Sequence, residues 1–354
     1  MDAAELDYAL PEAAIAQEPL EPRDAARLLV DHGPTRPVEH RTVADLADLL
    51  DPGDLLVVND TRVIPARLHL RKDTGGAVEV LLLERRPDGA WEALVKPSRR
   101  VPEGSRLRLA GEGGGDVAVE VGAVLGDDGR RLVTLHHGPG DDLDVLASAG
   151  EVPLPPYIHA PLADPDRYQT VFADRPGSVA APTAGLHLTD AVLDRCARRG
   201  IEVVRVELVV GLGTFRPITT DRVEDHPMHA ERYRIPPDAV TRLRERDAAR
   251  AEGAPGSVVA VGTTVVRALE SWAATGRAEG STDLFIREPY PFAVVDRLLT
   301  NFHVPRSSLL ALVQALVGPR WRDLYGEALR EGYRFLSFGD AMLLTRAAGS
   351  VAGP

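Results

Sequence analysis

The sequence has little cysteine and no long hydrophobic run. Cys196 is the only cysteine among 354 residues, which excludes an internal disulfide and a zinc site built from cysteines. The longest apolar stretch, residues 309–317, is about half as long as a membrane span and is interrupted by Gln314. The first residues are acidic and do not resemble a secretory signal peptide. We therefore expect a cytoplasmic protein with no membrane segment.

Basic residues are outnumbered by acidic ones. The 41 Lys and Arg residues stand against 53 Asp and Glu residues, a net charge of −12, which is unlike a nonspecific nucleic-acid binder. A local basic face remains compatible with this balance, because phosphate contacts depend on where the basic residues lie. One segment, residues 94–109, has a clear excess of positive charge, with a single acid, Glu103, against Lys96, Arg99, Arg100, Arg106 and Arg108.

The length of the chain is enough for about two domains, and the character of the sequence changes twice along it. Residues 69–155 contain short alternating segments separated by turn signals such as Pro87-Asp88-Gly89 and Asp127-Asp128-Gly129. This pattern predicts several short strands in a small barrel or sandwich, and no helix-length pattern is visible there. We expect an inserted β-barrel-like domain at 69–155, within a discontinuous α/β domain formed by 1–68 and 156–354.

The flanking parts repeat the order strand, turn, helix. A helix over 190–199 ends at Gly200 and precedes a buried strand over 201–210. A strand over 257–261 leads through Gly262-Thr263-Thr264 to a helix that stops at Gly276, and a later helix has Ser307 as its N-cap and Gly318 as its stop.

Polar residues follow the predicted strands. Asn59, Asp60, Thr61 and Arg62 end one apolar strand, and Asn301 and His303 stand at the end of another. Sheets of α/β proteins place ligands at the carboxyl ends of their strands, so these residues are candidates for binding. A plain Asx turn is the alternative at Asn59 and Asp60.

Three further segments contain candidate residues. The turn Gly262-Thr263-Thr264 at a helix start suits a phosphate or carboxylate, which Arg267 can also pair with. The alternative is that Thr263 only caps the helix and Arg267 is solvated. In the small-residue stretch 176–190, Gly177 and Gly185 allow close approach of a ligand, and His187, on a loop before the N-cap Thr189, suits proton transfer. A histidine bonded to a nearby carbonyl is the alternative there.

The segment DHPMHAER at 225–232 invites a metal interpretation. Pro227 breaks the helix that a zincin pattern needs, and a third convincing ligand beside His226 and His229 is lacking. We therefore expect no metal, and we favour an acid/base or hydrogen-bonding role for His229 and Glu231.

Taken together, these segments resemble the S-adenosylmethionine:tRNA ribosyltransferase-isomerase family of the queuosine pathway, over almost the whole chain. The N-terminal YALPEAAIAQEPLEPRDAARLLV resembles that family's opening, and VVNDTRVIPARL its first strand and exit. Further blocks in the family's order are GEVPLPPYI, DRYQTVFADRPGSVAAPTAGLHLT, GTFRPI, VGTTVVRALES, DRLLTNFHVPRSSLLALVQALVG and YRFLSFGDAMLL.

The resemblance implies a reaction and a fold. The ribosyl part of S-adenosylmethionine is transferred and isomerised onto 7-aminomethyl-7-deazaguanine at the tRNA wobble position, giving epoxyqueuosine and releasing adenine and methionine. No permanently bound cofactor and no metal are implied, and we expect a monomer whose partners are the tRNA and S-adenosylmethionine. The implied fold is an α/β domain with an inserted β-barrel-like domain.

The chemistry of the implied reaction indicates roles for the candidates, whereas the resemblance itself marks the segments and not the role of each residue. His187, His229 and Glu231 are the candidates for proton transfer, and Tyr168 or Phe215 for stacking on adenine. The candidates for binding substrate are Asp60, Arg62, Thr183, Gly185, Phe215, Arg216, Gly262, Thr263, Thr264, Arg267, Asn301 and His303. The basic residues Lys96, Arg99, Arg100, Arg106 and Arg108 are the candidates for binding tRNA.

Two departures from the family's pattern keep alternatives open. Glu288-Pro289 stands where Pro-Gly is usual, and Ala230 where Ser is usual. One alternative is a paralogue that uses S-adenosylmethionine on a small nucleoside or metabolite. The other is a catalytically silent tRNA-binding protein, and the argument against it is the retention of His187, His229, Glu231 and Arg267.

Overall fold

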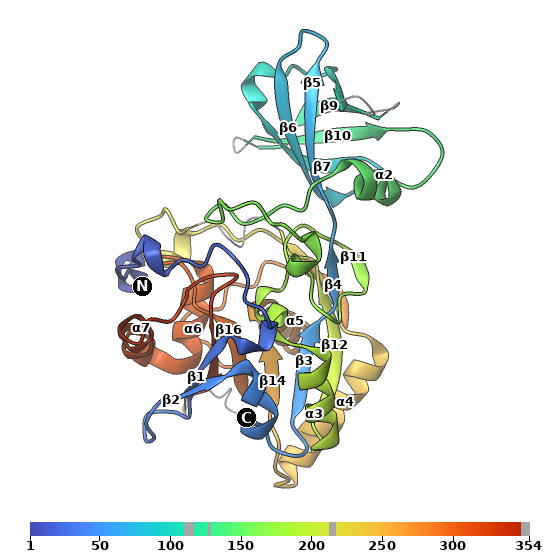
Figure 1. Ribbon diagram of the computed structural model, residues 1–354. Helices are drawn as coiled ribbons and strands as arrows, with labels where there is room; N and C mark the ends of the chain where they lie inside the picture. Colours follow the sequence, from blue (N-terminus) through green and yellow to red (C-terminus); the bar gives the residue numbers. More distant parts are fainter. Residues whose placement is uncertain (110–116, 127–128, 212–216, 348–354) are drawn as a thin grey trace. The chain divides into compact units, whose positions relative to one another are not determined.

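The computed structural model describes residues 1–109, 117–126, 129–211 and 217–347 (Figure 1). Their contacts divide the chain into two compact units. One, which we call the α/β unit, consists of residues 1–61, 155–175 and 181 onward; the other, the barrel unit, consists of residues 62–154 and 176–180. Whether residues 69–155 fold as a domain of their own stays a prediction.

The α/β unit is built on a mixed sheet, which confirms the predicted class. Among the described residues the sheet has nine strands, in the order β15 (Glu279–Thr282), β13 (Glu231–Arg234), β12 (Glu202–Leu208), β3 (Leu55–Asn59), β14 (Val258–Val261), β16 (Arg297–Asn301), β17 (Ala341–Thr345), β1 (Arg27–Asp31) and β2 (Glu39–Thr42). Strands β12, β3, β14 and β16 are parallel to one another, and β17 runs antiparallel to β16. The parallel strands are almost continuously apolar because both of their faces are covered.

Helices connect these strands, and their ends follow the predicted signals. The helices of the α/β unit are α1 (Leu46–Leu49), α3 (Asp190–Arg198), α4 (Pro237–Ala251), α5 (Thr263–Thr275), α6 (Ser308–Val317) and α7 (Trp321–Arg330). Thr189 caps α3 by accepting a hydrogen bond from the Val192 N–H, and Ser307 caps α6 in the same way. Gly276 ends α5 in the left-handed conformation, with φ of 70°.

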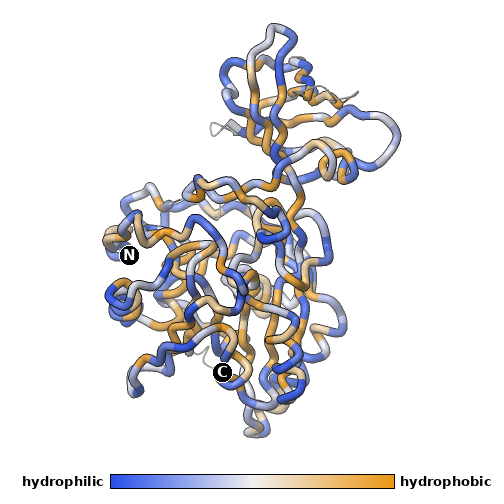
Figure 2. Tube along the Cα trace, viewed as in Figure 1, coloured by the Kyte–Doolittle hydropathy of each residue, from blue (hydrophilic) through white to orange (hydrophobic). Residues whose placement is uncertain are grey.

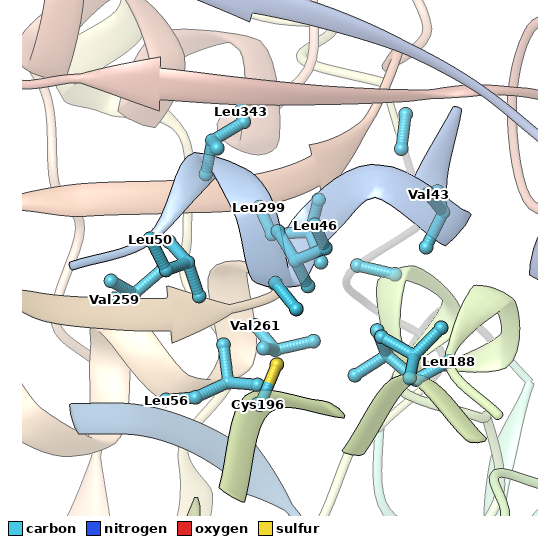
Figure 3. Packing of buried hydrophobic residues seen from close by; sticks show 14 of the residues in the cluster. Val43, Leu46, Leu50, Leu56, Leu188, Cys196, Val259, Val261, Leu299 and Leu343 are labelled. Carbon is cyan, nitrogen blue, oxygen red and sulfur yellow. The ribbon is translucent and has the colours of Figure 1, made fainter. Parts of the chain in front are cut away.

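One face of the sheet packs against α1 and α3 (Figure 3). Alternate residues of β3 and β14, among them Leu56 and Val261, meet Leu46 of α1 and Cys196 of α3. The single cysteine is therefore a buried core residue. Figure 2 shows the hydrophobic residues concentrated along the central strands, as a sheet covered by helices requires.

The barrel unit contains a closed barrel, so the sequence pattern identified its strands correctly. The strand order is β10 (Arg130–His136), β7 (Trp91–Lys96), β6 (Ala77–Arg85), β5 (Arg67–Lys72), β8 (Arg106–Leu109) and β9 (Ala118–Val124). Inward-facing residues such as Leu68, Leu70 and Leu107 are buried and alternate with exposed ones. A separate two-stranded sheet pairs β4 (Thr61–Val63) with β11 (Arg175–Ser178).

Residues 69–155 contain a helix, although no helix-length pattern is visible in their sequence. Helix α2 (Asp142–Ala149) follows the last barrel strand and begins with a capping box, in which Asp141 and Asp144 each accept a backbone hydrogen bond. Asp142 also accepts a hydrogen bond from Trp91 Nε1 at 2.8 Å, which ties α2 to β7. Eight residues are too few for a clear 3.6-residue pattern, and the capping box was the available signal.

Every helix in the described part of the chain is too short or too polar to cross a bilayer.

Candidate active site

A pocket opens at the carboxyl ends of the central parallel strands. Strand β12 lies on one side of β3 in the sheet, and the later strand β14 lies on its other side. Such a change of side is a topological switch point, where ligands of α/β sheets bind. We call this hollow the main pocket; its lining consists of Tyr157, Ala181, Pro182, Thr183, Ala184, Val210, Gly262, Thr263, Thr264, Thr300, Asn301, Phe302, His303, Val304, Leu309, Leu336 and Ser337. Six predicted substrate-binding residues are among them: Thr183, Gly262, Thr263, Thr264, Asn301 and His303.

The turn before α5 forms one wall of the main pocket. Gly262, with φ of 91°, is the N-cap of α5, so the alternative in which Thr263 caps the helix is wrong. The first turn of a helix leaves backbone N–H groups without helical partners, and the positive end of the helix dipole lies there. Thr264 Oγ1 also accepts a long hydrogen bond of 3.4 Å from Asn59 Nδ2. This wall suits a carboxylate or phosphate.

Arg267 does not share that wall. Its guanidinium pairs with the carboxylate of Glu231 on β13 and also donates to the Leu284 and Thr282 carbonyls. The side chains of both partners are buried, with 7% and 4% of their surface exposed. The expectation that Arg267 and the turn hold one anion together is therefore wrong, because Glu231 already balances the charge of Arg267.

Glu231 and Arg267 line a second pocket. Its wall includes His226, His229, Phe285 and Ser308, and Leu309 lines both this pocket and the main one. His229 is half-buried. Burial and the nearby His229 lower the pKa of His226. The structure thus brings together two of the three residues expected to transfer protons.

The third, His187, lies elsewhere. The expected loop position is wrong, because His187 ends the 3₁₀ helix η7 (Thr183–His187) and its side chain is buried. Its Nε2 lies 2.9 Å from the amide nitrogen of Asn301, whose oxygen accepts a hydrogen bond from Thr183 Oγ1 at 2.9 Å. Burial, reinforced by Arg334, Arg167 and Arg23, lowers the pKa of His187 to about 4. His187 is therefore neutral at pH 7.

His303 is also held neutral. Burial lowers its pKa to about 3, and Nε2 lies 2.9 Å from Thr300 Oγ1. Its backbone is fixed by Tyr325, whose hydroxyl accepts from the His303 N–H, and by Tyr8, whose hydroxyl donates to the His303 carbonyl. A neutral imidazole can accept or donate a hydrogen bond but carries no charge to a ligand.

The remaining candidates that the structure describes do not line the main pocket. Asp60 is buried, which raises the pKa of its carboxyl, and Arg175 lies 3.9 Å from it. Arg62 is exposed on β4 in the barrel unit. Gly185 packs against the ring of Phe172, and Tyr168 is a core residue that meets Phe338 edge to face. Phe215 and Arg216 lie outside the described residues.

Sequence reasoning did not single out Tyr157, Leu336 and Ser337, which all line the main pocket. The Tyr157 hydroxyl lies 2.7 Å from Ser337 Oγ, and burial raises the pKa of Tyr157 to about 12. Leu336 has φ of 68°, a left-handed conformation that a leucine rarely adopts. The signal was present, because these residues lie in the blocks GEVPLPPYI and YRFLSFGDAMLL.

The two departures from the family pattern lie in different surroundings. The Glu288–Pro289 peptide is cis, and the Glu288 carboxylate accepts a hydrogen bond from Gln314 of α6 at 3.0 Å, so this turn is built without the usual glycine. Ala230 is exposed. Among the described residues, no group of three or more His, Cys, Asp or Glu side chains is arranged to hold a metal ion.

The predicted tRNA-binding residues are all exposed, but their surroundings differ. In the barrel, Lys96 stands opposite Glu79 in the strand register, and Arg106 stands opposite Glu120. Arg108 stands opposite Arg71 and lies 3.5 Å from Asp73. Arg99 and Arg100 lie on the short 3₁₀ helix η5 (Ser98–Arg100), where Lys72 donates to the Arg100 carbonyl. The positive charge is therefore least balanced around Arg99 and Arg100.

Comparisons with known proteins identify relatives over nearly the full length. Residues 3–344 match a family model described as queuosine biosynthesis protein. The chain is 52% identical to an S-adenosylmethionine:tRNA ribosyltransferase-isomerase of Thermus thermophilus, over 96% of this chain and 98% of that protein. It is 47% identical to the protein of that name from Thermotoga maritima, over 97% of this chain and 100% of that protein. A crystal structure of S-adenosylmethionine tRNA ribosyltransferase from Thermotoga maritima matches with a TM-score of 0.53 and 37% identity, covering 96% of this chain and 99% of that one.

Proposed function

Because the chain belongs to the queuosine biosynthesis protein family, we propose that it is an S-adenosylmethionine:tRNA ribosyltransferase-isomerase. It transfers and isomerises the ribosyl part of S-adenosylmethionine onto 7-aminomethyl-7-deazaguanine at the tRNA wobble position. The products are epoxyqueuosine in tRNA, adenine and methionine. The observation that carries the proposal is the main pocket, whose polar lining at the switch point of the sheet comes from the segments that resemble this family.

The main pocket suits S-adenosylmethionine. The N-terminus of α5, with Thr263 and Thr264, offers donors to the methionine carboxylate. Asn301 and Thr183 offer an amide and a hydroxyl to the ribose or the ammonium group. We assign no permanent cofactor and no metal, and we place the reaction in the cytoplasm with the protein acting as a monomer.

The reaction needs proton transfers. The sulfonium acidifies the adjacent 5′ protons, so a base must remove one, and the tRNA amine must be neutral before it attacks. Adenine leaves more easily when one of its ring nitrogens accepts a proton or a strong hydrogen bond. We assign these transfers to the second pocket, where half-buried His229 lies beside Glu231 and Arg267. The Arg267 guanidinium pairs with the Glu231 carboxylate, and both side chains line the same pocket as His229.

The exposed basic residues of the barrel unit suit the tRNA phosphates. Phosphate contacts supply most of the affinity that does not depend on sequence, and the protein's net charge of −12 makes a local excess of positive charge necessary for such contacts.

The test is mass spectrometry of nucleosides from tRNA that carries the deazaguanine precursor, after incubation with protein and S-adenosylmethionine. We expect epoxyqueuosine, with adenine and methionine released only when both substrates are present. Adenine release with a free nucleoside but not with tRNA would favour the small-molecule paralogue. Binding of tRNA without turnover would favour the silent tRNA-binding protein.

A further inference from the structure

His187 lies at a junction between two hollows. It lines a small cavity together with Arg23, Arg167 and Gly339, while its partner Asn301 lines the main pocket. Both side chains are buried, with 5% and 3% of their surface exposed. The charge and the tautomer of the His187 ring are therefore set by its protein neighbours.

The neighbours of Asn301 fix which way its amide points. The amide nitrogen faces the backbone carbonyl of Asp340 at 3.4 Å, and a carbonyl can only accept a hydrogen bond. The amide oxygen faces Thr183 Oγ1 at 2.9 Å, and a hydroxyl can donate to it. A flipped amide would set its oxygen against the Asp340 carbonyl, so the orientation with nitrogen toward His187 is favoured.

This orientation has a consequence for His187. An amide N–H is a donor, so the ring nitrogen that faces it, Nε2, must accept and carries no proton. In a neutral imidazole the proton then lies on Nδ1. We propose that Asn301 is a positioning residue that holds His187 as the neutral Nδ1–H tautomer, so that His187 serves the site as a fixed hydrogen-bond donor and not as a proton shuttle.

The charges around the ring act in the same direction. Arg334, Arg167 and Arg23 face His187 from three separate segments, and each disfavours a positively charged ring. The carboxylate of Asp340 is engaged by the Arg27 and Arg334 backbone N–H groups, both at 2.8 Å, and not by the His187 ring. Protonation of His187 would also lose the hydrogen bond from Asn301.

The tautomer can be measured directly by NMR of the full-length protein labelled with 15N-histidine. We expect a pyridine-type nitrogen at Nε2 and a pyrrole-type nitrogen at Nδ1, unchanged from about pH 8 to about pH 5. Loss of the signals in His187→Gln identifies them. A pyrrole-type Nε2, or a ring that titrates near the ordinary histidine pKa, would overturn the proposal.

A variant tests the part that Asn301 plays. In Asn301→Asp a carboxylate, which only accepts, faces Nε2, so we expect the proton to move to Nε2 and the pKa of His187 to rise. Thr183→Val, which removes the hydroxyl but keeps the amide, is the matched control and should leave His187 as Nδ1–H. An unchanged tautomer in Asn301→Asp would show that Asn301 does not set it.

The part of the proposal that concerns catalysis rests on the proposed function, whereas the tautomer of His187 does not. The NMR signals are read on free protein, so the wild-type result stands even if Asn301→Asp does not fold or the enzyme acts on another substrate. In the turnover assay we expect Asn301→Asp to lower kcat and to introduce a new ionisation into its pH profile. An Asn301→Asp profile with the wild-type shape would contradict the proposed role.

Discussion

The pair of Glu231 and Arg267 is the most deeply buried contact between opposite charges in the second pocket. Glu231 belongs to a strand and Arg267 to a helix, and the Gly211 N–H also donates to the Glu231 carboxylate at 2.9 Å. Taking two charges out of water is costly, and removing one partner leaves the other buried and uncompensated. Such a pair therefore holds β13 against α5 at the wall of the second pocket.

We expect Arg267→Met to lower the free energy of unfolding by about 3–5 kcal/mol, because it strands the Glu231 carboxylate. The double variant Glu231→Gln with Arg267→Met should lose clearly less than the sum of the single variants. Urea unfolding measures all three. Glu245→Gln, which breaks an exposed pair with Arg242 on α4, is the control and should cost less than about 1 kcal/mol. Equal losses at the two pairs would contradict this account.

Some residues of the site could be predicted from the sequence. Asn301 and His303 were predicted because they stand at a strand end, and Thr263 because it lies in a turn at a helix start that suits an anion; all three line the main pocket. The pairing of Arg267 with Glu231 could not be predicted, because the partners are 36 residues apart and meet only through the order of strands in the sheet. The contact between Tyr157 and Ser337 could not be predicted for the same reason, because these residues are 180 positions apart.

At the scale of elements, prediction worked best where a local signal is strong. The six barrel strands follow from alternating residues between turn signals, and the starts of α3 and α6 from Thr189 and Ser307. The closure of the barrel depends on pairing between β10 and β9 and between β5 and β8, which alternation along one strand does not specify. Helix η7 was missed because its small residues have no periodic apolar face.

Gly185 has a role in η7 that differs from the expected one. A Cβ added at Gly185 would lie 2.7 Å from Phe172 Cζ and 3.0 Å from Thr170 Cγ2. The glycine therefore allows the close approach of a core ring, and Phe172 is itself buried in the cluster beneath the sheet.

We expect Gly185→Ala to destabilise the protein by about 1–3 kcal/mol, because the added methyl group overpacks against the Phe172 ring. Thermal or urea unfolding measures the loss. Gly138→Ala is the matched control, since a Cβ there would meet nothing within 4 Å, and it should leave stability almost unchanged. A Gly185→Ala variant as stable as Gly138→Ala would show that the core yields at this point.

At the scale of the whole molecule, two buried histidines link stability to pH. Burial first, and nearby arginines second, lower the pKa of His187 from 6.5 to about 4, and burial lowers that of His303 from 6.5 to about 3. Between these values and 6.5 the unfolded chain binds protons that the folded protein does not. Stability contributed by neutral His187 and His303 is therefore present above pH 6.5 and is lost as the pH falls.

We expect each histidine to reduce the free energy of unfolding by about 1.4 kcal/mol per pH unit below about pH 6. Burial raises the pKa of Glu270 and Asp340, whose protonation in the folded state acts in the opposite direction. The measurement is therefore the difference between wild type and His303→Gln or His187→Gln in urea unfolding from pH 7 to 5. Each variant should lose less stability than wild type over this range, and parallel curves would refute the prediction.

The barrel unit and the main pocket belong to different units, so tRNA affinity and S-adenosylmethionine binding can be altered separately. The positive charge is least balanced at Arg99 and Arg100, which follow β7 on η5, whereas Lys96 and Arg106 face acidic residues across the barrel strands. Each phosphate contact displaces counterions, so the number of contacts is read from the dependence of affinity on salt.

We expect reversal of Arg99 and Arg100 to Glu to weaken tRNA binding and to reduce the magnitude of the log–log salt slope by roughly two. S-adenosylmethionine binding should be unchanged. Reversal of Arg198 and Arg199 to Glu, at the end of α3 in the α/β unit, changes the net charge by the same amount and serves as the control for long-range repulsion. Filter binding across a salt series distinguishes the two effects. Long-range repulsion alone would weaken tRNA binding equally in both double variants. Direct phosphate contacts would reduce the salt slope only in the variant at Arg99 and Arg100. An unchanged affinity and slope in that variant would mean that the tRNA phosphates bind elsewhere, because the loss of two phosphate contacts must reduce the number of counterions released.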